Sequence, residues 1–206
     1  MTKGLFITFE GGEGSGKTSI ITRLIPMLEK LGQNVVTSRE PGGVKIAEDI
    51  RSIILNPENT QMCYETEALL FAASRMQHLK EKVIPALNEG KIVICDRYLD
   101  SSLVYQGISR GLGIDKVMQV NAFALDYMPQ KTFFIDVCPS VGLERLKGRD
   151  KSDRLDREKL DFHDRIYQGY KDLAKMYPER IETIDGERDI DSIVLDVYNC
   201  IVELLK

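Results

Sequence analysis

The 206-residue sequence has no excess of positive charge, because its 28 lysines and arginines are set against 32 aspartates and glutamates, for a formal net charge of −4. Broad binding of nucleic acid or of an anionic membrane needs a basic surface, so we expect neither partner. The sequence also lacks a long apolar run near its start, where the first run covers residues 5–9 and is followed by Glu10. Such a run is too short for a signal peptide or a membrane span, and we expect a cytoplasmic protein.

Cysteine and histidine are scarce and scattered. The two histidines and four cysteines form no C-x-x-C pair, and the cysteines are Cys63, Cys95, Cys138 and Cys200. Structural zinc sites need such ligands in close groups, so we expect no zinc site here. We interpret the cysteines as free, buried thiols in a reducing compartment rather than as disulfides.

A phosphate-binding loop is present near the start of the chain. Residues 11–18 read GGEGSGKT, a complete G-x-x-x-x-G-K-[ST] motif between the apolar run 5–9 and a stretch with helical spacing of apolar residues. This order turns the backbone N–H groups and the positive helix N-terminus towards one concavity, which a glycine turn that binds nothing would not need. Lys17 can reach the β and γ phosphates and the Thr18 hydroxyl suits Mg²⁺. The predicted phosphate ligands are Gly11, Gly12, Glu13, Gly14, Ser15, Gly16, Lys17 and Thr18.

Apolar, often β-branched runs recur at residues 5–9, 34–37, 91–95, 132–137 and 180–184, and amphipathic stretches of helical length separate them. This alternation predicts an α/β fold of three layers, a parallel five-stranded sheet flanked by helices. The phosphate loop after its first strand assigns the sheet to the P-loop NTP hydrolase and kinase type. The expected helices cover residues 17–31, 43–55, 65–88, 99–107, 114–127, 139–147, 156–176 and 189–205. Nothing resembles a linker, so we expect one domain over residues 1–206.

Ligands of such sheets bind beyond the carboxyl ends of the strands, so residues directly after a strand are candidates for the site. Asp96 and Arg97 follow the run 91–95; the carboxylate can hold Mg²⁺ directly or through water, and the guanidinium suits bidentate contact with a phosphate. A strand-end salt bridge is the alternative. Arg39 follows the run 34–37 and precedes the turn 40–43, either as a second phosphate ligand or as part of a plain turn.

Two helical faces have the composition of a base-binding site. Phe71 and Arg75 are spaced i, i+4, so a ring that stacks on a flat heterocycle lies beside a guanidinium that donates to its carbonyls. A core phenylalanine with a surface arginine is the alternative. Ser102, Tyr105 and Gln106 repeat this spacing, and Gln106 carries both a donor and an acceptor, as the N3–H and O4 edge of thymine or uracil requires. Alone, this second group would be a polar helix face.

A basic segment lies between residues 145 and 157. It holds three aspartates and six cations, which are Arg145, Lys147, Arg149, Lys151, Arg154 and Arg157. A solvated, salt-bridged loop is the ordinary interpretation. Phosphoryl transfer, however, needs more cations around the migrating group than Mg²⁺ and one lysine, and the phosphate loop contains no arginine. We therefore predict a mobile lid over about residues 145–157 that supplies an arginine, excludes water and closes before reaction.

Together these motifs resemble the thymidylate kinase family, P-loop nucleoside monophosphate kinases that transfer a phosphoryl group from ATP to dTMP. The resemblance covers nearly the whole length, and its most specific segments are 9–18, 39–43, 70–75, 96–98, 101–102 and 105–107. It implies a transferase that uses ATP and Mg²⁺ in direct in-line transfer, for dTTP synthesis. It also implies a homodimer that pairs through helices.

The resemblance further implies roles for residues of the acceptor site. Phe71 would stack on thymine, and the other base-site residues would be Arg75, Gln106 and Ser102. The arginines on the dTMP phosphate side would be Arg39, Arg97 and Arg51. Tyr105 would favour deoxyribose by crowding the sugar 2′ position, and Glu13 would lie near the acceptor sugar and the metal.

The pairing of a basic lid with a phosphate loop that lacks arginine resembles a bacterial subclass in which the lid supplies the catalytic cation. We expect this cation to be Arg149, with Arg154 as the second choice. Together with Lys17 and Arg97, these are the predicted catalytic residues, and Thr18 and Asp96 are the predicted metal ligands.

Two other functions remain open from the residues themselves. A nucleotide-dependent switch needs base-reading and switch motifs, but the chain contains no [NT]-K-x-D and no D-x-x-G. A kinase for another monophosphate, such as dUMP, would differ from a dTMP kinase by recognition of a single methyl group. Such recognition contributes only about 1–3 kcal/mol.

Overall fold

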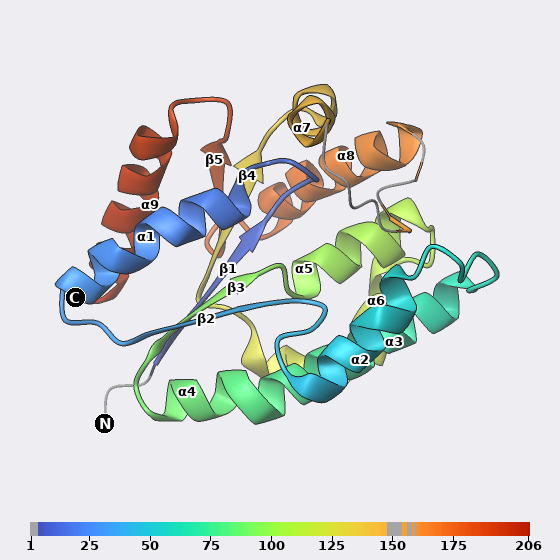
Figure 1. Cartoon of the computed structure of the whole chain (residues 1–206), viewed down its shortest axis with the longest axis horizontal. Coiled ribbons are helices and arrows are strands. Elements are labelled where there is room, and N and C mark those ends of the chain that lie inside the picture. The colour runs from blue at the N-terminus through green and yellow to red at the C-terminus, as the bar shows by residue number, and fades with distance from the viewer. Residues whose placement is uncertain (1–3, 148–153, 156–157, 159) are drawn as a thin grey trace.

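A parallel five-stranded sheet forms the centre of the computed structural model, which describes residues 4–147, 154, 155, 158 and 160–206 (Figure 1). The strand order is β2-β3-β1-β4-β5. The strands are β1 (Leu5–Glu10), β2 (Val35–Arg39), β3 (Ile92–Asp96), β4 (Lys131–Asp136) and β5 (Ile181–Asp185). Each begins and ends within two residues of its predicted position, so the α/β sheet inferred from the apolar runs is confirmed.

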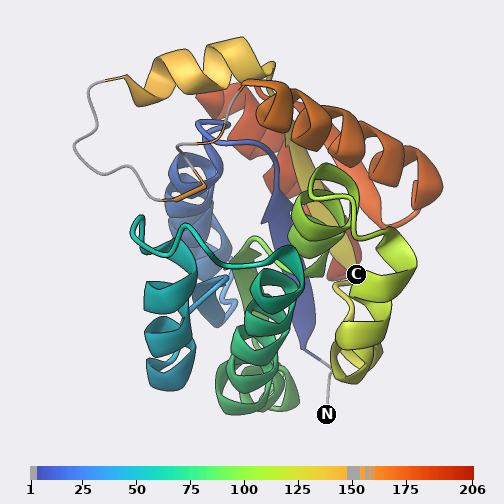
Figure 2. The same ribbon diagram turned by 90° about the vertical axis from the view of Figure 1, so that its right-hand side faces the viewer.

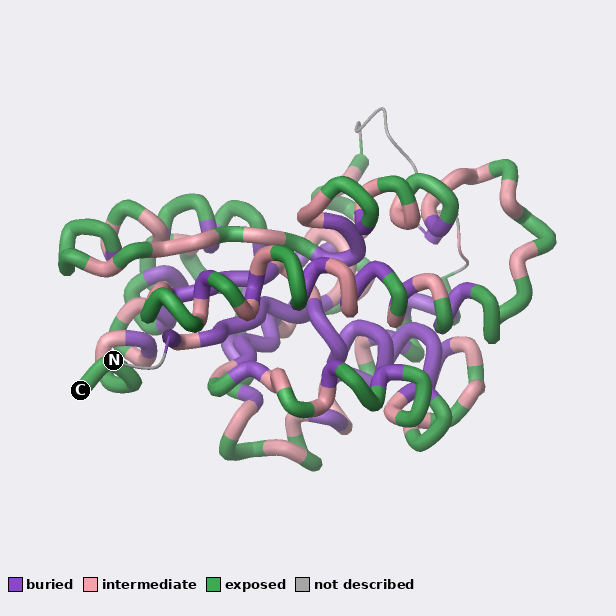
Figure 3. Tube along the Cα trace, turned by 90° about the horizontal axis from the view of Figure 1, so that it is seen from below, coloured by how far each residue is buried: buried purple, intermediate pink, exposed green. Residues whose placement is uncertain are grey.

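Helices cover both faces of the sheet, because successive strand residues point to opposite sides and both sides are apolar. Ile7 and Ile94 pack into a core under α1 (Lys17–Lys30) and α9 (Ile190–Leu204). Phe6 and Val93 pack into a second core on the other face. The turned view shows these layers, and the buried residues gather along the strands and the inner sides of the helices (Figures 2 and 3).

The second core is covered mainly by the helices that follow β2 and β3, together with α8. These helices are α2 (Lys45–Leu55), α3 (Tyr64–His78), α4 (Ile84–Asn88), α5 (Leu99–Ser102), α6 (Ile114–Val120) and α8 (Leu160–Met176). A further helix, α7 (Pro139–Leu146), follows β4 near the phosphate loop. The helix predicted over 65–88 is continuous, but its middle, η1 (Leu79–Val83), has π-helical geometry. Pro85 lacks an N–H and its ring crowds the preceding turn, which a wider turn relieves.

Two other predicted helices also change their winding. The one predicted over 99–107 is α5 for four residues and continues as a π-helical segment, η2 (Leu103–Ser109). The one predicted over 114–127 is α6 followed by a 3₁₀ segment, η3 (Ala122–Tyr127). Apolar periodicity indicates a helix but does not separate α from π or 3₁₀ winding, since these differ by a fraction of a residue per turn.

The carboxyl ends of three strands meet at one edge of the sheet. Asp96, at the end of β3, is in register with Phe9 of β1 and with Arg39 of β2. The phosphate loop leaves β1 at this edge, and the peptide bond between Glu40 and Pro41, directly after β2, is cis. Segments that are far apart in the sequence therefore meet there.

The cysteines are free, as expected, but the expectation that all are buried is wrong for two of them. Cys63 and Cys138 precede α3 and α7 and are exposed, Cys95 is buried in β3, and Cys200 is partly buried. In the part of the chain that the structure describes, no helix has the length and apolar character to cross a membrane.

Candidate active site

The phosphate loop has the backbone shape that its glycines predict. Gly14 and Gly16 have φ values of 69° and 92°, a region that residues with a side chain rarely adopt. Lys17 begins α1, and its Nζ donates to the carbonyl oxygens of Gly11 and Gly12 at 3.2 and 3.0 Å. Burial, followed by the charge of Arg97, lowers the pKa of Lys17 to about 8. The Lys17 ammonium group is thus held over the loop, and it loses its proton more easily than an exposed lysine does.

A cavity of about 320 Å³ opens over this loop, and we refer to it as the phosphate cavity. Its lining consists of Glu13, Gly14, Ser15, Gly16, Lys17, Thr18, Ser19, Asp96, Arg97, Arg145 and Leu146. Thr18 Oγ1 donates to Asp96 Oδ2 at 3.0 Å, so the two predicted metal ligands face each other on the wall of this cavity. The predicted loop residues and Asp96 are therefore brought together.

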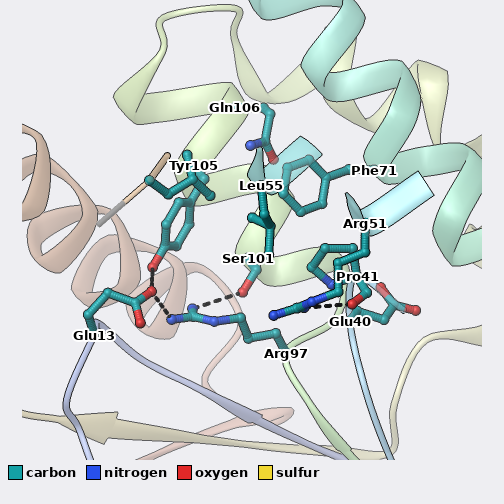
Figure 4. A pocket seen from close by; sticks show the side chains of 11 residues that line it. Glu13, Glu40, Pro41, Arg51, Leu55, Phe71, Arg97, Ser101, Tyr105 and Gln106 are labelled. Atoms are coloured by element: carbon teal, nitrogen blue, oxygen red, sulfur yellow. Dashed lines mark hydrogen bonds and ion pairs between the residues drawn. The ribbon is translucent and has the colours of Figure 1, made fainter. Parts of the chain in front are cut away.

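A second cavity, of about 100 Å³, lies between the ends of β2 and β3 and the helices that follow them (Figure 4). We refer to it as the acceptor cavity. Its lining consists of Glu13, Glu40, Pro41, Arg51, Leu55, Phe71, Arg97, Ser101, Tyr105, Gln106 and Leu155. The ring of Phe71 and the amide of Gln106 lie at one end, and Glu13 and Arg97 lie at the other. The cavity thus has a flat, partly apolar end and a charged end.

Two residues, Arg97 and Glu13, line both cavities. Arg97 Nη2 donates to Glu13 Oε1 at 2.5 Å, and Arg97 Nη1 donates to the carbonyl oxygen of Gly11 at 2.9 Å. Its guanidinium also lies 5.1 Å from the centre of the Tyr105 ring. Burial opposes the charge of Arg97, but Glu13 together with Tyr105, Tyr170 and Asp96 outweighs burial, and the pKa of Arg97 is raised well above its ordinary value. A permanently charged cation thus stands where the cavities meet.

Glu13 is held ionised at the same place. Burial alone would raise its pKa, but Arg97 and Lys17 outweigh burial and lower it. The Tyr105 hydroxyl donates to Glu13 Oε1 at 3.1 Å. Tyr105 therefore lies against the wall between the cavities, with its hydroxyl fixed by the carboxylate.

Gln106 presents an acceptor to the acceptor cavity. Its Nε2 donates to Glu67 Oε1 at 2.9 Å, and its Oε1 is buried with no hydrogen-bond partner among the described residues. Buried polar atoms are nearly always paired, so an unpaired carbonyl in a cavity wall indicates a ligand that donates a hydrogen bond. The position of this oxygen is consistent with the predicted role of Gln106 in contacting a base.

Arg75 and Ser102 differ from their predicted positions, because neither lines the acceptor cavity. Arg75 is 1% exposed and donates to Glu40, Asn121, Ser102 and the carbonyl oxygen of Tyr98. These bonds use four of its five N–H groups, which leaves at most one for a ligand. The surface-arginine alternative is wrong, since Arg75 is part of the buried wall behind Phe71.

The two other arginines predicted on the phosphate side line different cavities. Arg51 lines the acceptor cavity and donates to the carbonyl oxygen of Pro41 at 2.7 Å. Arg39 points instead to a third cavity, of about 420 Å³, which also borders Thr18 and Asp96. There its Nη2 donates to both carboxylate oxygens of Glu48, at 3.0 and 3.1 Å. The structure does not bring Arg39 to the acceptor cavity.

The predicted lid falls largely outside the described residues, and this includes Arg149, the first choice for the catalytic cation. Arg154, the second choice, lines neither cavity; its guanidinium pairs with Glu67 and donates to the carbonyl oxygen of Ile54. Arg145, which belongs to the predicted basic segment but was not among the predicted catalytic residues, lines the phosphate cavity and donates to the carbonyl oxygen of Gly186. Its place in the basic segment was the sequence signal, and the structure puts it one residue before the end of α7.

Four buried acids among the described residues were missed from the sequence, namely Glu10, Glu40, Glu67 and Asp100. Glu10, the last residue of β1, accepts hydrogen bonds from the backbone N–H of Tyr98 and the hydroxyls of Ser101 and Tyr170. Burial, with the nearby charge of Asp100, raises the pKa of Glu10 to about 7. A charged residue at the end of a strand with no other charge was the signal that could have revealed Glu10.

The parallel sheet, the phosphate loop and the strand-end aspartate define a P-loop α/β protein of the nucleotide kinase type. Residues 9–197 match the family model described as thymidylate kinase. The chain belongs to the thymidylate kinase family.

Curated relatives match along almost the whole chain. The thymidylate kinase of Oceanobacillus iheyensis is 51% identical over 98% of this chain and 92% of its own length. That of Clostridium novyi is 50% identical over 96% of this chain and 98% of its own length. The crystal structure of thymidylate kinase from Ehrlichia chaffeensis superposes with a TM-score of 0.77 at 33% identity, covering 97% of this chain and 98% of that one.

Proposed function

We propose that this protein phosphorylates dTMP to dTDP with ATP and Mg²⁺, by direct in-line transfer between the two cavities. The observation that carries the proposal is the pair of adjoining cavities that share Arg97 and Glu13, one over a phosphate loop and one ending in a ring and an amide. Family membership supports the same reaction, because the relatives at about 50% identity are thymidylate kinases. The donor nucleotide would bind in the phosphate cavity and dTMP in the acceptor cavity.

The oxygen ligands of the phosphate cavity fit Mg²⁺. The hydroxyl of Thr18 faces the carboxylate of Asp96, and no cluster of three or more potential ligand side chains occurs among the described residues. Mg²⁺ in phosphoryl-transfer sites is held by one or two protein ligands together with water and the substrate phosphates, so this small ligand set is suitable. When bound, the ion would neutralise charge on the phosphate oxygens.

The acceptor cavity fits a pyrimidine nucleotide that carries an N3–H. The Phe71 ring offers a stacking surface, and the unpaired Oε1 of Gln106 accepts a hydrogen bond. Thymine and uracil donate from N3, whereas cytosine has an unprotonated N3. At the other end, Arg51 and Arg97 provide cations for a monophosphate.

Arg97 is the residue best suited to align the two substrates. Its contacts with Glu13 and with Gly11 hold the guanidinium between the cavities without a change of protonation state. Lys17 approaches the transferred group from the loop side. Stabilisation of charge and alignment supply most of the rate in phosphoryl transfer, so no covalent intermediate is needed.

The proposal is tested by incubating the purified protein with ATP and Mg²⁺ and following ADP release with each of several acceptors. The panel contains dTMP, dUMP, UMP, dCMP, AMP, GMP and thymidine. We expect dTMP to give the highest kcat/KM. If dTMP does not raise the rate of ADP release above that of the control without acceptor, the proposal is contradicted. A higher kcat/KM for another monophosphate would reassign the acceptor.

We also propose that the protein is a homodimer. An exposed apolar patch joins α3 and the end of α6, with a hollow lined by Leu69, Ala72, Ala73, Met76, Val120, Asn121, Phe123 and Ala124. Phe123, at its edge, is 80% exposed. A protruding ring beside a shallow hollow is a self-complementary shape, which suits a two-fold contact between copies.

A further inference from the structure

The buried carboxylate of Glu67 lies behind the base-reading end of the acceptor cavity and is not itself part of the cavity wall. It accepts from Gln106 Nε2 at 2.9 Å and from Arg110 Nε and Nη2 at 3.3 Å each, and it pairs with Arg154. The side chain thus joins η2, which carries Gln106, to Arg154.

Glu67 is ionised in this environment. Burial alone would raise its pKa, but the hydrogen bond from Gln106 and the charges of Arg110 and Arg154 outweigh burial, and the pKa is lowered. An ionised carboxylate accepts hydrogen bonds and donates none. The orientation of the Gln106 amide therefore follows from chemistry, because a reversed amide would set its carbonyl oxygen against a carboxylate oxygen.

This orientation decides what Gln106 offers to a ligand. With Nε2 committed to Glu67, only the unpaired Oε1 faces the acceptor cavity. A free glutamine amide could turn to present either atom and would accept thymine, uracil or cytosine. A fixed acceptor pairs with the N3–H of thymine or uracil and opposes the lone pair at N3 of cytosine.

We propose that Glu67 is the positioning residue that restricts the acceptor site to pyrimidines with an N3–H, by locking the Gln106 amide in one orientation. The inference rests on the proposed function, and it adds a determinant of specificity outside the substrate-contacting set. Glu67 acts through Gln106 and touches no substrate atom.

The central test is Glu67→Gln, measured with dTMP and with dCMP in the same assay. A neutral amide at position 67 can donate as well as accept, so the Gln106 amide is free to turn. We expect the ratio of kcat/KM for dTMP to that for dCMP to fall about tenfold or more, mainly through KM, since sites built around fixed hydrogen bonds owe large discrimination to them. A merely structural role would reduce both values together and leave the ratio unchanged.

Two further variants make the test specific. Glu65→Gln changes an exposed carboxylate on the same helix and should leave the ratio as in the unmodified protein. The exchange Glu67→Gln with Gln106→Glu keeps the charge and one amide–carboxylate contact, so an acceptor again faces the cavity and the ratio should recover. If Glu67→Gln does not fold, the double variant Glu67→Gln with Gln106→Glu tests the inference instead. A folded double variant that uses dCMP as well as dTMP overturns the inference.

The outcomes separate the inference from the proposed function. Absence of dTMP turnover by the unmodified protein rejects the function itself. Turnover of dTMP by the unmodified protein, with the same dTMP to dCMP ratio in folded Glu67→Gln, rejects only the role of Glu67.

Discussion

At the scale of single residues, buried carboxylates organise the candidate site. Glu10 fixes Ser101 and Tyr170, Glu40 binds Arg75 and His78, and Glu67 binds Gln106. A buried carboxyl group is costly unless hydrogen-bond partners satisfy its oxygens, so each of these acids orders the donors around it. The residues that would contact substrate are therefore positioned by acids lying beside or behind them.

Lys17→Ala tests the phosphate loop. The ammonium group of Lys17 lies against the loop carbonyls, and removal of one donor to a developing charge costs about a hundredfold to a thousandfold in kcat. We expect kcat with ATP and dTMP to fall by roughly this factor while the circular dichroism spectrum and unfolding midpoint stay close to those of the unmodified protein. Lys30→Ala, on the exposed last turn of the same helix, is the control; equal turnover in the two variants would contradict the role.

The raised pKa of Glu10 predicts a pH-dependent stability. In the unfolded chain this carboxyl titrates near 4.5, and in the folded protein near 7, so the folded state binds more protons between these values. The contribution of Glu10 is fully present below about pH 4.5 and is lost as the pH rises through 7; 2.5 pKa units correspond to about 3 kcal/mol as an order of magnitude.

Glu10→Gln should remove this contribution to the pH dependence. Urea unfolding at pH 5, 6, 7 and 8 measures it as the difference in slope between the variant and the unmodified protein, because all other titrating groups are shared. Parallel stability curves over this range would show that Glu10 is not the group responsible.

At the scale of elements, α7 touches the phosphate loop backbone to backbone. A Cβ built on Gly142 would lie 2.3 Å from the carbonyl oxygen of Glu13, and one on Gly14 would lie 2.0 Å from the carbonyl oxygen of Gly142. Only two glycines allow the helix and the loop to come this close. This contact sets the position of Arg145, which α7 carries to the phosphate cavity.

Gly142→Ala is expected to weaken ATP binding. Within an exposed helix this substitution would favour folding by up to about 1 kcal/mol, but here the methyl group meets backbone and must displace α7 or the loop. We expect KM for ATP to rise several-fold and the unfolding midpoint not to increase. Ser140→Ala, at an exposed position of the same helix, serves as control, and an unchanged KM for ATP in Gly142→Ala would exclude a tight contact.

At the scale of the whole molecule, the apolar patch on α3, α6 and η3 is the surface assigned to self-association. Phe123→Asp places a charge where an exposed ring protrudes from the proposed contact and should convert a dimer to a monomer in sedimentation equilibrium. Leu195→Asp changes a half-exposed leucine on α9, on the other side of the sheet, and should leave the mass unchanged. A monomeric unmodified protein, or a dimer that survives Phe123→Asp, contradicts the assignment.

The sequence alone determined the sheet, the phosphate loop and the strand-end aspartate. These features are determined by local sequence. The glycines shape the loop in which they occur, and each buried strand is recognisable as a continuous apolar run. Phe71, Tyr105 and Gln106 were also found as candidates, since helical spacing is readable without the fold.

Only the tertiary structure decided which distant residues meet. The locking of Gln106 by Glu67, the burial of Arg75, the direction of Arg39 and the pairing of Arg154 join residues 9 to 87 positions apart. The sequence around a polar side chain does not show which distant residue will be its hydrogen-bond partner. The free energy of burying a charge depends on hydrogen-bond donors that packing brings from other helices and strands. Neither apolar periodicity nor motif spacing shows which donors these are.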